Sequence, residues 1–185
     1  MKIEETNLEG LSVITSDILE DNRGFFAELY RKDLFEERGI NVNFVQQNVS
    51  VSGKRVIRAL HFQWDKPLGK FIRVTDGRVL AVAADIRKNS STLGKWFGIE
   101  LGKDNRKAMY APPGFAFGFC VLDDPAEVQY LYTALRNANA ESSILWNDPT
   151  IEIKWPIKDP ILSEKDASAQ TFEEWMRRPE ADYFR

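Results

Sequence analysis

The chain has 185 residues, of which 43% are hydrophobic and 29% charged, and its formal net charge is -3. This length predicts one domain over residues 1–185, and because acidic and basic residues are mixed along the chain, neither nucleic acid nor a membrane surface is an expected partner. The sequence contains no apolar stretch of membrane-spanning length and no signal-peptide core near residue 1, so we expect a cytoplasmic protein.

Short apolar runs broken by Gly, Asp, Asn and Pro dominate the chain and predict a mainly β protein. In chain order, strands are expected at 24–30, 44–49, 56–62, 71–74, 79–86, 96–101, 107–110, 117–121, 128–133 and 151–153. Between the fourth and fifth of these strands, Asp76-Gly77 predicts a tight hairpin turn, since this pair readily supplies positive φ. Such regular short strands favour a sandwich or barrel.

Two segments predict short helices at the periphery of this β-structure. The first spans residues 32–38 and is stopped by Gly39. The second spans residues 171–178, where Thr171 can cap the helix and Glu174 stands three residues further on. The aromatic tail to residue 185 could cap the fold or pack on another chain, and the sequence alone does not distinguish these.

One histidine and one cysteine limit the chemistry. A single imidazole cannot build a multi-histidine metal centre, so we expect no metal or other cofactor, and His61 to act, if at all, as an acid or base. Cys120 can form no internal disulfide, which fits a reducing compartment, and its apolar surroundings at 118–122 predict a core position.

The candidate reactive residues His61, Lys70, Tyr130 and Asp166 are scattered, and their spacing alone does not bring them together. Arg58 lies three residues before His61, so on a regular strand the two side chains would point to opposite faces. Both can reach one site only through a bulge or at a strand end.

A series of segments carries a family resemblance over about residues 21–169. They are Asp21-Asn22-Arg23-Gly24-Phe25-Phe26-Ala27-Glu28, Phe44-Val45-Gln46-Gln47-Asn48, Arg58-Ala59-Leu60-His61-Phe62-Gln63, Gly69-Lys70, Asp85-Ile86-Arg87, Pro113-Gly114-Phe115-Ala116, Ile144-Leu145-Trp146-Asn147-Asp148, Trp155-Pro156 and Leu162-Ser163-Glu164-Lys165-Asp166. In this order they resemble the dTDP-4-dehydrorhamnose 3,5-epimerase family, cupin-type jelly rolls that act on nucleotide-linked 4-keto-6-deoxy sugars. The resemblance implies a cupin jelly-roll fold here as well.

The resemblance also implies roles for the reactive residues. His61 matches the family's base, Asp166 the carboxylate that orients it, and Lys70 the cation beside the developing enolate oxygen. Tyr130 matches the acid that returns a proton from the opposite face, while Tyr132, two residues on and on the same strand face, stays an alternative acid.

Further positions match substrate contacts of the family. Those expected to bind the nucleotide diphosphate or the sugar are Arg23, Glu28, Gln46, Asn48, Arg58, Phe117, Glu141 and Lys165. Arginine suits a diphosphate, because its planar guanidinium can donate two hydrogen bonds to phosphate oxygens. A homodimer in which the subunits exchange strand material is implied by the same resemblance.

Several positions depart from the family's pattern. Phe117 stands where the family usually has histidine, Ala81 where it has aspartate, Ala59 where it has glycine, and Leu135-Arg136 where it has two tyrosines. An apolar wall at Phe117 and Ala81 would leave a buried substrate hydroxyl unpaired, at a cost of about 1 to 3 kcal/mol. We therefore expect either a substrate that differs from the family's usual one or inversion at only one carbon. The change at 135–136 alters the surface on which the nucleobase would stack.

The expected function is epimerisation of a nucleotide-linked 4-keto-6-deoxyhexose, carried on dTDP, at C3, C5 or both, in deoxysugar biosynthesis. The alternatives are a single-centre epimerase of a modified deoxysugar, a related ketoisomerase that moves the carbonyl between C3 and C4, and a noncatalytic sugar-nucleotide binding module. Replacing His61 by Asn separates the last from the enzymes, because a binding module has no proton exchange to lose.

Overall fold

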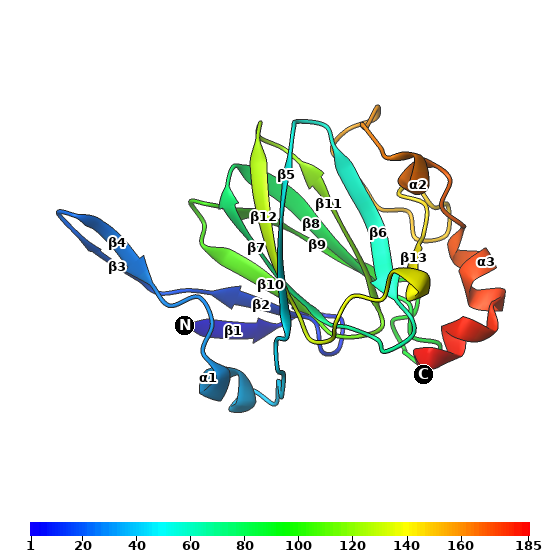
Figure 1. The fold of residues 1–185 in the computed structure, drawn as a ribbon, viewed down its shortest axis with the longest axis horizontal. Coiled ribbons are helices and arrows are strands. Elements are labelled where there is room, and N and C mark those ends of the chain that lie inside the picture. The colour runs from blue at the N-terminus through cyan, green and yellow to red at the C-terminus, as the bar shows by residue number, and fades with distance from the viewer.

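Two antiparallel β-sheets face each other in the computed structural model, which describes all residues 1–185 (Figure 1). The first sheet has the strand order β1 (Lys2–Glu5), β2 (Ser12–Thr15), β10 (Lys107–Ala111), β7 (Lys70–Asp76), β12 (Ala126–Tyr132) and β5 (Gln46–Ser52). The second has the order β13 (Glu141–Ser143), β6 (Ile57–Gln63), β11 (Phe115–Val121), β8 (Arg78–Asp85) and β9 (Trp96–Gly102). The predicted mainly β sandwich is confirmed.

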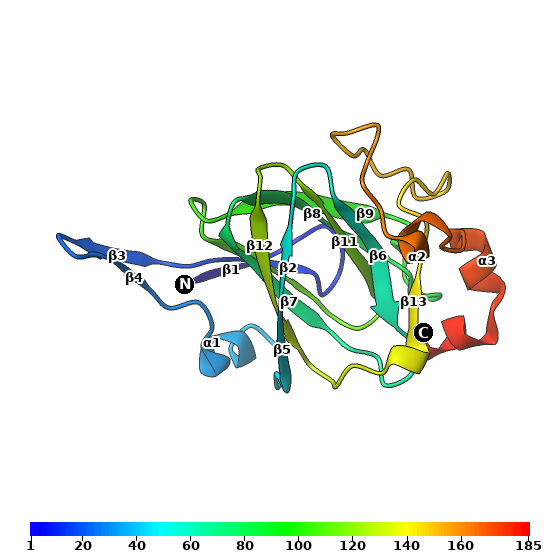
Figure 2. The same cartoon turned by 45° about the horizontal axis from the view of Figure 1, so that its top comes forward.

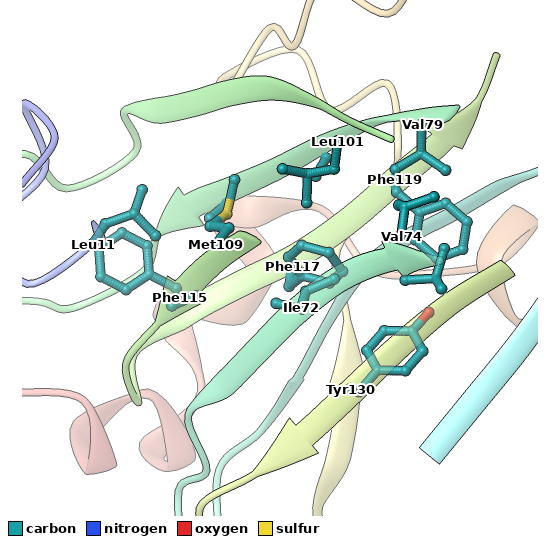
Figure 3. Packing of buried hydrophobic residues seen from close by; sticks show 14 of the residues in the cluster. Leu11, Ile72, Val74, Val79, Leu101, Met109, Phe115, Phe117, Phe119 and Tyr130 are labelled. Atoms are coloured by element: carbon teal, nitrogen blue, oxygen red, sulfur yellow. The ribbon is translucent and has the colours of Figure 1, made fainter. Parts of the chain in front are cut away.

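Strand β11 is buried along its whole length because both of its faces are covered. Phe115, Phe117 and Phe119 point between the two sheets, where Figure 3 shows them packed with side chains of β7 and β12. The alternate residues Ala116 and Cys120 face a second apolar cluster on the other side of the five-stranded sheet. Cys120 therefore lies in the core, as predicted, and burial raises the pKa of its thiol to about 11.

The C-terminal segment covers the outer face of the five-stranded sheet (Figure 2). It contains α2 (Glu164–Ala167), α3 (Phe172–Arg177) and the 3-10 helix η2 (Pro179–Tyr183), after a shorter 3-10 helix η1 (Ala138–Ala140). Helix α3 begins with the predicted capping box of Thr171 and Glu174. Trp175 packs edge to face on Phe62, with ring centroids 4.5 Å apart, so the aromatic tail caps the fold.

A short hairpin projects from the N-terminal part of the molecule (Figure 1). Its strands are β3 (Ile18–Asp21) and β4 (Gly24–Ala27). Leu19 and Phe26 are 69% and 68% exposed. The chain then forms α1 (Lys32–Glu36), which places Phe35 against the outer face of the six-stranded sheet, and Gly39 follows the helix with φ +75°. None of the helices is long and apolar enough to cross a membrane.

The predicted hairpin around Asp76-Gly77 is wrong. The turn exists, with Gly77 at φ +69°, but β7 pairs with β10 and β12 while β8 pairs with β11 and β9. The chain thus passes from one sheet to the other at this turn. A tight-turn signal reports the local backbone conformation and carries no information on which strands pair afterwards.

The predicted strand at residues 151–153 is also wrong. Ile151 and Ile153 are buried, which explains their apolar character, but Glu152 between them has φ +54° and the segment pairs with no strand. Asp148 fixes this segment instead, because its Oδ1 accepts the backbone N–H groups of Thr150 and Ile151.

Candidate active site

A cavity of about 370 Å³ opens between the two sheets and α2. Both sheets and α2 contribute to its wall, which consists of Asn48, Val49, Ser50, Arg58, His61, Phe62, Gln63, Leu68, Lys70, Phe117, Phe119, Tyr130, Tyr132, Glu141, Ser163, Lys165 and Asp166. The four residues expected to be reactive are therefore brought together, although they were scattered in the sequence.

Strand β6 presents both Arg58 and His61 to this cavity because it contains a β-bulge. Phe117 on β11 lies opposite His61 and Phe119 lies opposite Arg58, so two steps along β11 match three along β6. Ala59 and Leu60 both face the second apolar cluster, and side-chain alternation is restored on either side of them. The condition set by the sequence spacing is thus met.

His61 is paired with Asp166 from α2. The distance from His61 Nε2 to Asp166 Oδ1 is 2.5 Å, and the aspartate is buried. Ser163 caps α2, and its hydroxyl accepts the backbone N–H of Asp166 at 3.1 Å. A carboxylate only accepts, so in the neutral imidazole the proton lies on Nε2, and the other ring nitrogen then carries a lone pair.

Lys70 lies in the wall with its ammonium almost fully enclosed. Its Nζ donates to the carbonyl oxygen of His61 at 2.9 Å and lies 5.7 Å and 5.9 Å from the ring centres of Phe117 and Tyr132. Burial lowers the pKa of Lys70 to about 8, an effect that the negative charge of Glu141 partly opposes. The lysine is a cation at neutral pH that few neighbouring groups stabilise.

Tyr130 reaches the cavity from β12, in the sheet opposite the one that carries His61. Its hydroxyl lies 3.0 Å from that of Ser50, and burial raises the pKa of the phenol to about 12, so it stays protonated at neutral pH. Tyr132 lines the same wall, and burial raises its pKa as well. Both tyrosines thus have the expected orientation.

Charged side chains gather at the rim. Arg136 donates two hydrogen bonds to Glu141, at 2.7 Å and 2.9 Å, and Lys165 lies 3.7 Å from the same carboxylate. Burial alone would raise the pKa of Glu141, but the hydrogen bonds and charge of Arg136, with the charges of Lys165 and Lys70, hold it below its usual value. Arg58 forms no ion pair, and its Nε donates to Ser52.

Three of the expected substrate-binding residues lie outside the cavity wall. Gln46 is next to it, donates to Asn48 at 2.9 Å, and accepts the backbone N–H of Arg136. Arg23 lies at the tip of the projecting hairpin, where it pairs with Asp21, and Glu28 lies at the base of that hairpin. The structure of one chain does not bring Arg23 and Glu28 to the cavity.

Phe117 and Ala81 do not form one apolar wall, and that part of the prediction is wrong. Phe117 lines the cavity and packs edge to face on Tyr130, at 6.4 Å between ring centres. Ala81 lies on β8, opposite Phe119 of β11, where it is fully buried and does not line the cavity. Only the phenylalanine therefore changes the surface that a ligand would meet.

Sequence reasoning missed several residues of the wall. Ser50 follows Gln46 and Asn48 at intervals of two, so strand alternation alone could have placed it on the same face. Ser163 stands three residues before Asp166, the spacing of a helix cap. Gln63 ends a segment that matches the family, but neither spacing nor residue type assigns it a role: it donates to the carbonyls of Lys66 and Leu135 and so fixes the segment after β12. No three His, Cys, Asp or Glu side chains could hold a metal ion together.

Comparisons with known proteins agree with this architecture. The family model for dTDP-4-dehydrorhamnose 3,5-epimerase matches residues 5–174. The enzyme of that name from Methanothermobacter thermautotrophicus is 44% identical over 88% of this chain and 89% of its own, and that from Escherichia coli K12 is 42% identical over 96% and 97%.

A solved structure is similar over nearly the whole chain. It is that of a dTDP-6-deoxy-D-glucose-3,5-epimerase from Legionella pneumophila in complex with dTDP-4-keto-L-rhamnose, with a TM-score of 0.92 and 38% identity over 97% of this chain and 96% of that one. Proteins with these names are isomerases. The chain belongs to the dTDP-4-dehydrorhamnose 3,5-epimerase family.

Proposed function

We propose that this chain epimerises a dTDP-linked 4-keto-6-deoxyhexose at C3, C5 or both, in deoxysugar biosynthesis. The observation that carries the proposal is the convergence of a carboxylate-paired histidine, a buried lysine and a protonated tyrosine on one cavity. The names of the relatives described above indicate that they act on this class of substrate.

His61 acts as the base in this proposal. The 4-keto group acidifies the hydrogens on C3 and C5, and the ring nitrogen not bonded to Asp166 takes one of them. The positive charge that then forms on the imidazole is stabilised by the buried carboxylate. Asp166 therefore orients the ring and supports its charged form.

Lys70 and Tyr130 supply the other two requirements of the reaction. The Lys70 ammonium places a positive charge where the oxygen at C4 becomes an enolate, and in a buried site this attraction is weakly screened. Inversion requires a proton from the face opposite the base, and Tyr130 and His61 stand on facing sheets. Tyr132 stays the alternative acid, because it lines the same wall as Tyr130.

Arg58 and Lys165 are proposed to bind the diphosphate, with Asn48, Gln46 and Glu141 binding sugar or nucleobase. Arg58 is suited to the task because no carboxylate neutralises it. Phe117 presents a hydrocarbon ring beside Lys70, so a substrate hydroxyl at that point would lack a hydrogen-bond partner. This favours a substrate without that hydroxyl, or inversion at only one of the two carbons.

Proton NMR of dTDP-4-keto-6-deoxyglucose in heavy water tests the proposal, with the C3 and C5 hydrogens followed separately. Loss of both signals indicates that both carbons are deprotonated, as a double epimerase requires, and loss of one identifies the only carbon at which the proton is exchanged. His61→Asn is expected to lower the rate of exchange by several orders of magnitude, while dTDP binding is retained. Exchange that is unaffected by this substitution would refute the assignment of the base.

We propose in addition that two chains form a homodimer through the projecting hairpin. Its apolar side chains, Leu19, Phe25 and Phe26, are exposed, as is Val51 on β5, which does not line the cavity. Exposed apolar surface of this kind is typical of protein interfaces. A hairpin that crosses to the other chain would carry Arg23 and Glu28 towards the second cavity.

We also propose a cytoplasmic location, which the single unpaired cysteine supports.

Mixing two inactive variants tests the exchange of hairpins. If Arg23 serves the cavity of the other subunit, a dimer of one His61→Asn chain and one Arg23→Ala chain contains one intact site. Activity should then return after the two variants are unfolded and refolded together. No recovery, in a sample shown by light scattering to be dimeric, would place Arg23 in its own subunit's site, and full activity of Arg23→Ala alone would place it in neither.

A further inference from the structure

The bulge in β6 decides which side chains of that strand reach the cavity. Without it, strict alternation would place Ala59 and His61 on one face, and Arg58 and Leu60 on the other. With it, Arg58 and His61 share the cavity face, while Ala59 and Leu60 are both fully buried in the apolar cluster behind the strand.

Gly118 on β11 lies opposite this bulge. A Cβ placed on Gly118 would lie 2.6 Å from Ala59 Cβ, 2.8 Å from the Arg58 carbonyl oxygen and 2.9 Å from Ala59 Cα. Two of these atoms belong to the backbone, so a side-chain rotation cannot relieve the contacts. The φ of Gly118 is not positive, so a glycine is required here because there is no room for a Cβ, and not because of the backbone conformation.

We propose that Gly118 is a positioning residue for the reaction: its missing side chain gives room for the bulge that turns Arg58 and His61 into the same cavity. The diphosphate-binding residue and the base are thereby held in a fixed relation by a single backbone feature. The proposal rests on the function proposed above only in one respect, that Arg58 binds the diphosphate of the substrate.

The effect of a side chain at position 118 is expected to fall on Arg58. The three close contacts are all with Arg58 and Ala59. His61 pairs with Phe117 on the same strand as Gly118, but it is also held from the other side, by Asp166 on its ring and by pairing with Ser143 on β13. Gly118→Ala should therefore displace the guanidinium, which donates to Ser52 at 3.0 Å, and leave the base in place.

Titration calorimetry with dTDP, combined with steady-state kinetics, tests this division. Gly118→Ala is expected to raise the Kd for dTDP about tenfold and to change kcat less than about threefold, whereas Arg58→Ala should raise the Kd about 30-fold. If Gly118 acts through Arg58, the double variant should bind no more than about twofold more weakly than Arg58→Ala alone. Losses that add in full would overturn the proposal.

Gly98→Ala provides the matched control. Gly98 lies on β9 of the same sheet, where an added Cβ would approach the Trp96 side chain at 3.0 Å, away from the cavity. It should alter dTDP binding less than about twofold. If Gly118→Ala does not fold, Ala59→Gly in the same chain removes the closest contact, and the cycle with Arg58 is run in that background.

A crystal structure of Gly118→Ala tests the role of Gly118 without an activity measurement. Displacement of Arg58 from Ser52, with His61 still on Asp166, supports the proposal. An unchanged position of Arg58 would overturn it, whatever the enzyme does. If Arg58→Ala binds dTDP as tightly as the wild type, Arg58 does not bind the diphosphate. The crystal structure of Gly118→Ala then still tests whether Gly118 positions Arg58.

Discussion

Replacing Lys70 by Met is expected to stabilise the fold and abolish the reaction. Burial lowers the pKa of Lys70 from 10.5 to about 8, which corresponds to an unfavourable free energy of about 3 kcal/mol for the charged form in the folded state. Methionine has a similar length and no charge, but it leaves the His61 carbonyl without its hydrogen bond, at a cost of about 1 kcal/mol. The net gain in unfolding free energy is about 2 kcal/mol at pH 7.

The gain should depend on pH in a defined direction. The pKa of Lys70 is lower in the folded than in the unfolded chain, so the unfolded chain binds more protons between about pH 8 and 10.5 and the wild type becomes more stable as pH rises through this interval. The advantage of the methionine variant should be complete below pH 8 and nearly gone at about pH 10.

Urea unfolding at pH 7 and at pH 10, at one protein concentration, measures this difference. Lys54→Met is the control, because Lys54 is exposed and makes no ion pair, so its substitution should change stability little at either pH. A Lys70→Met protein that is less stable than the wild type at pH 7 would refute the argument that burial of the ammonium is costly.

Three further outcomes follow from the site and its supports. Turnover should fall as the pH rises through about 8, because Lys70 then loses its charge, and a profile that stays flat to about pH 9.5 would contradict this. Tyr130→Phe should keep exchange of the substrate hydrogen with heavy water but lower formation of the inverted product about 100-fold, as followed by NMR; unchanged product formation would favour Tyr132 as the acid. Thr171→Ala should cost about 1 kcal/mol of stability in urea unfolding and leave kcat within about twofold, since it removes only the cap of α3.

The central strands could be predicted from the sequence because their pattern is strong. Strands β9, β10, β11 and β12 lie within one or two residues of the predicted ranges, since each carries a run of apolar side chains against the core. The strands β1, β2, β3 and β13 were not predicted, because they have three or four residues each, too few for a periodic pattern.

The candidate site was predicted by family motifs rather than by residue spacing. No local rule connects His61 to Asp166, whose pairing depends on how α2 docks against β6. Spacing did give one geometric condition, that Arg58 and His61 need a bulge to share a site, and the register of β6 meets it. The positions of Ala81 and Phe117 could not be separated in advance, because both are buried and only the tertiary structure shows which one lines the cavity.

The pairing of His61 with Asp166 joins residues 105 positions apart. Contacts between such distant residues form late, because a long loop must close before they contribute. During synthesis the strands of both sheets leave the ribosome before α2 and α3 do, so the chain can build its β-sandwich while the imidazole still has no carboxylate beside it. In a refolding experiment, catalytic activity should therefore appear after the β-structure, at the rate at which the C-terminal segment docks.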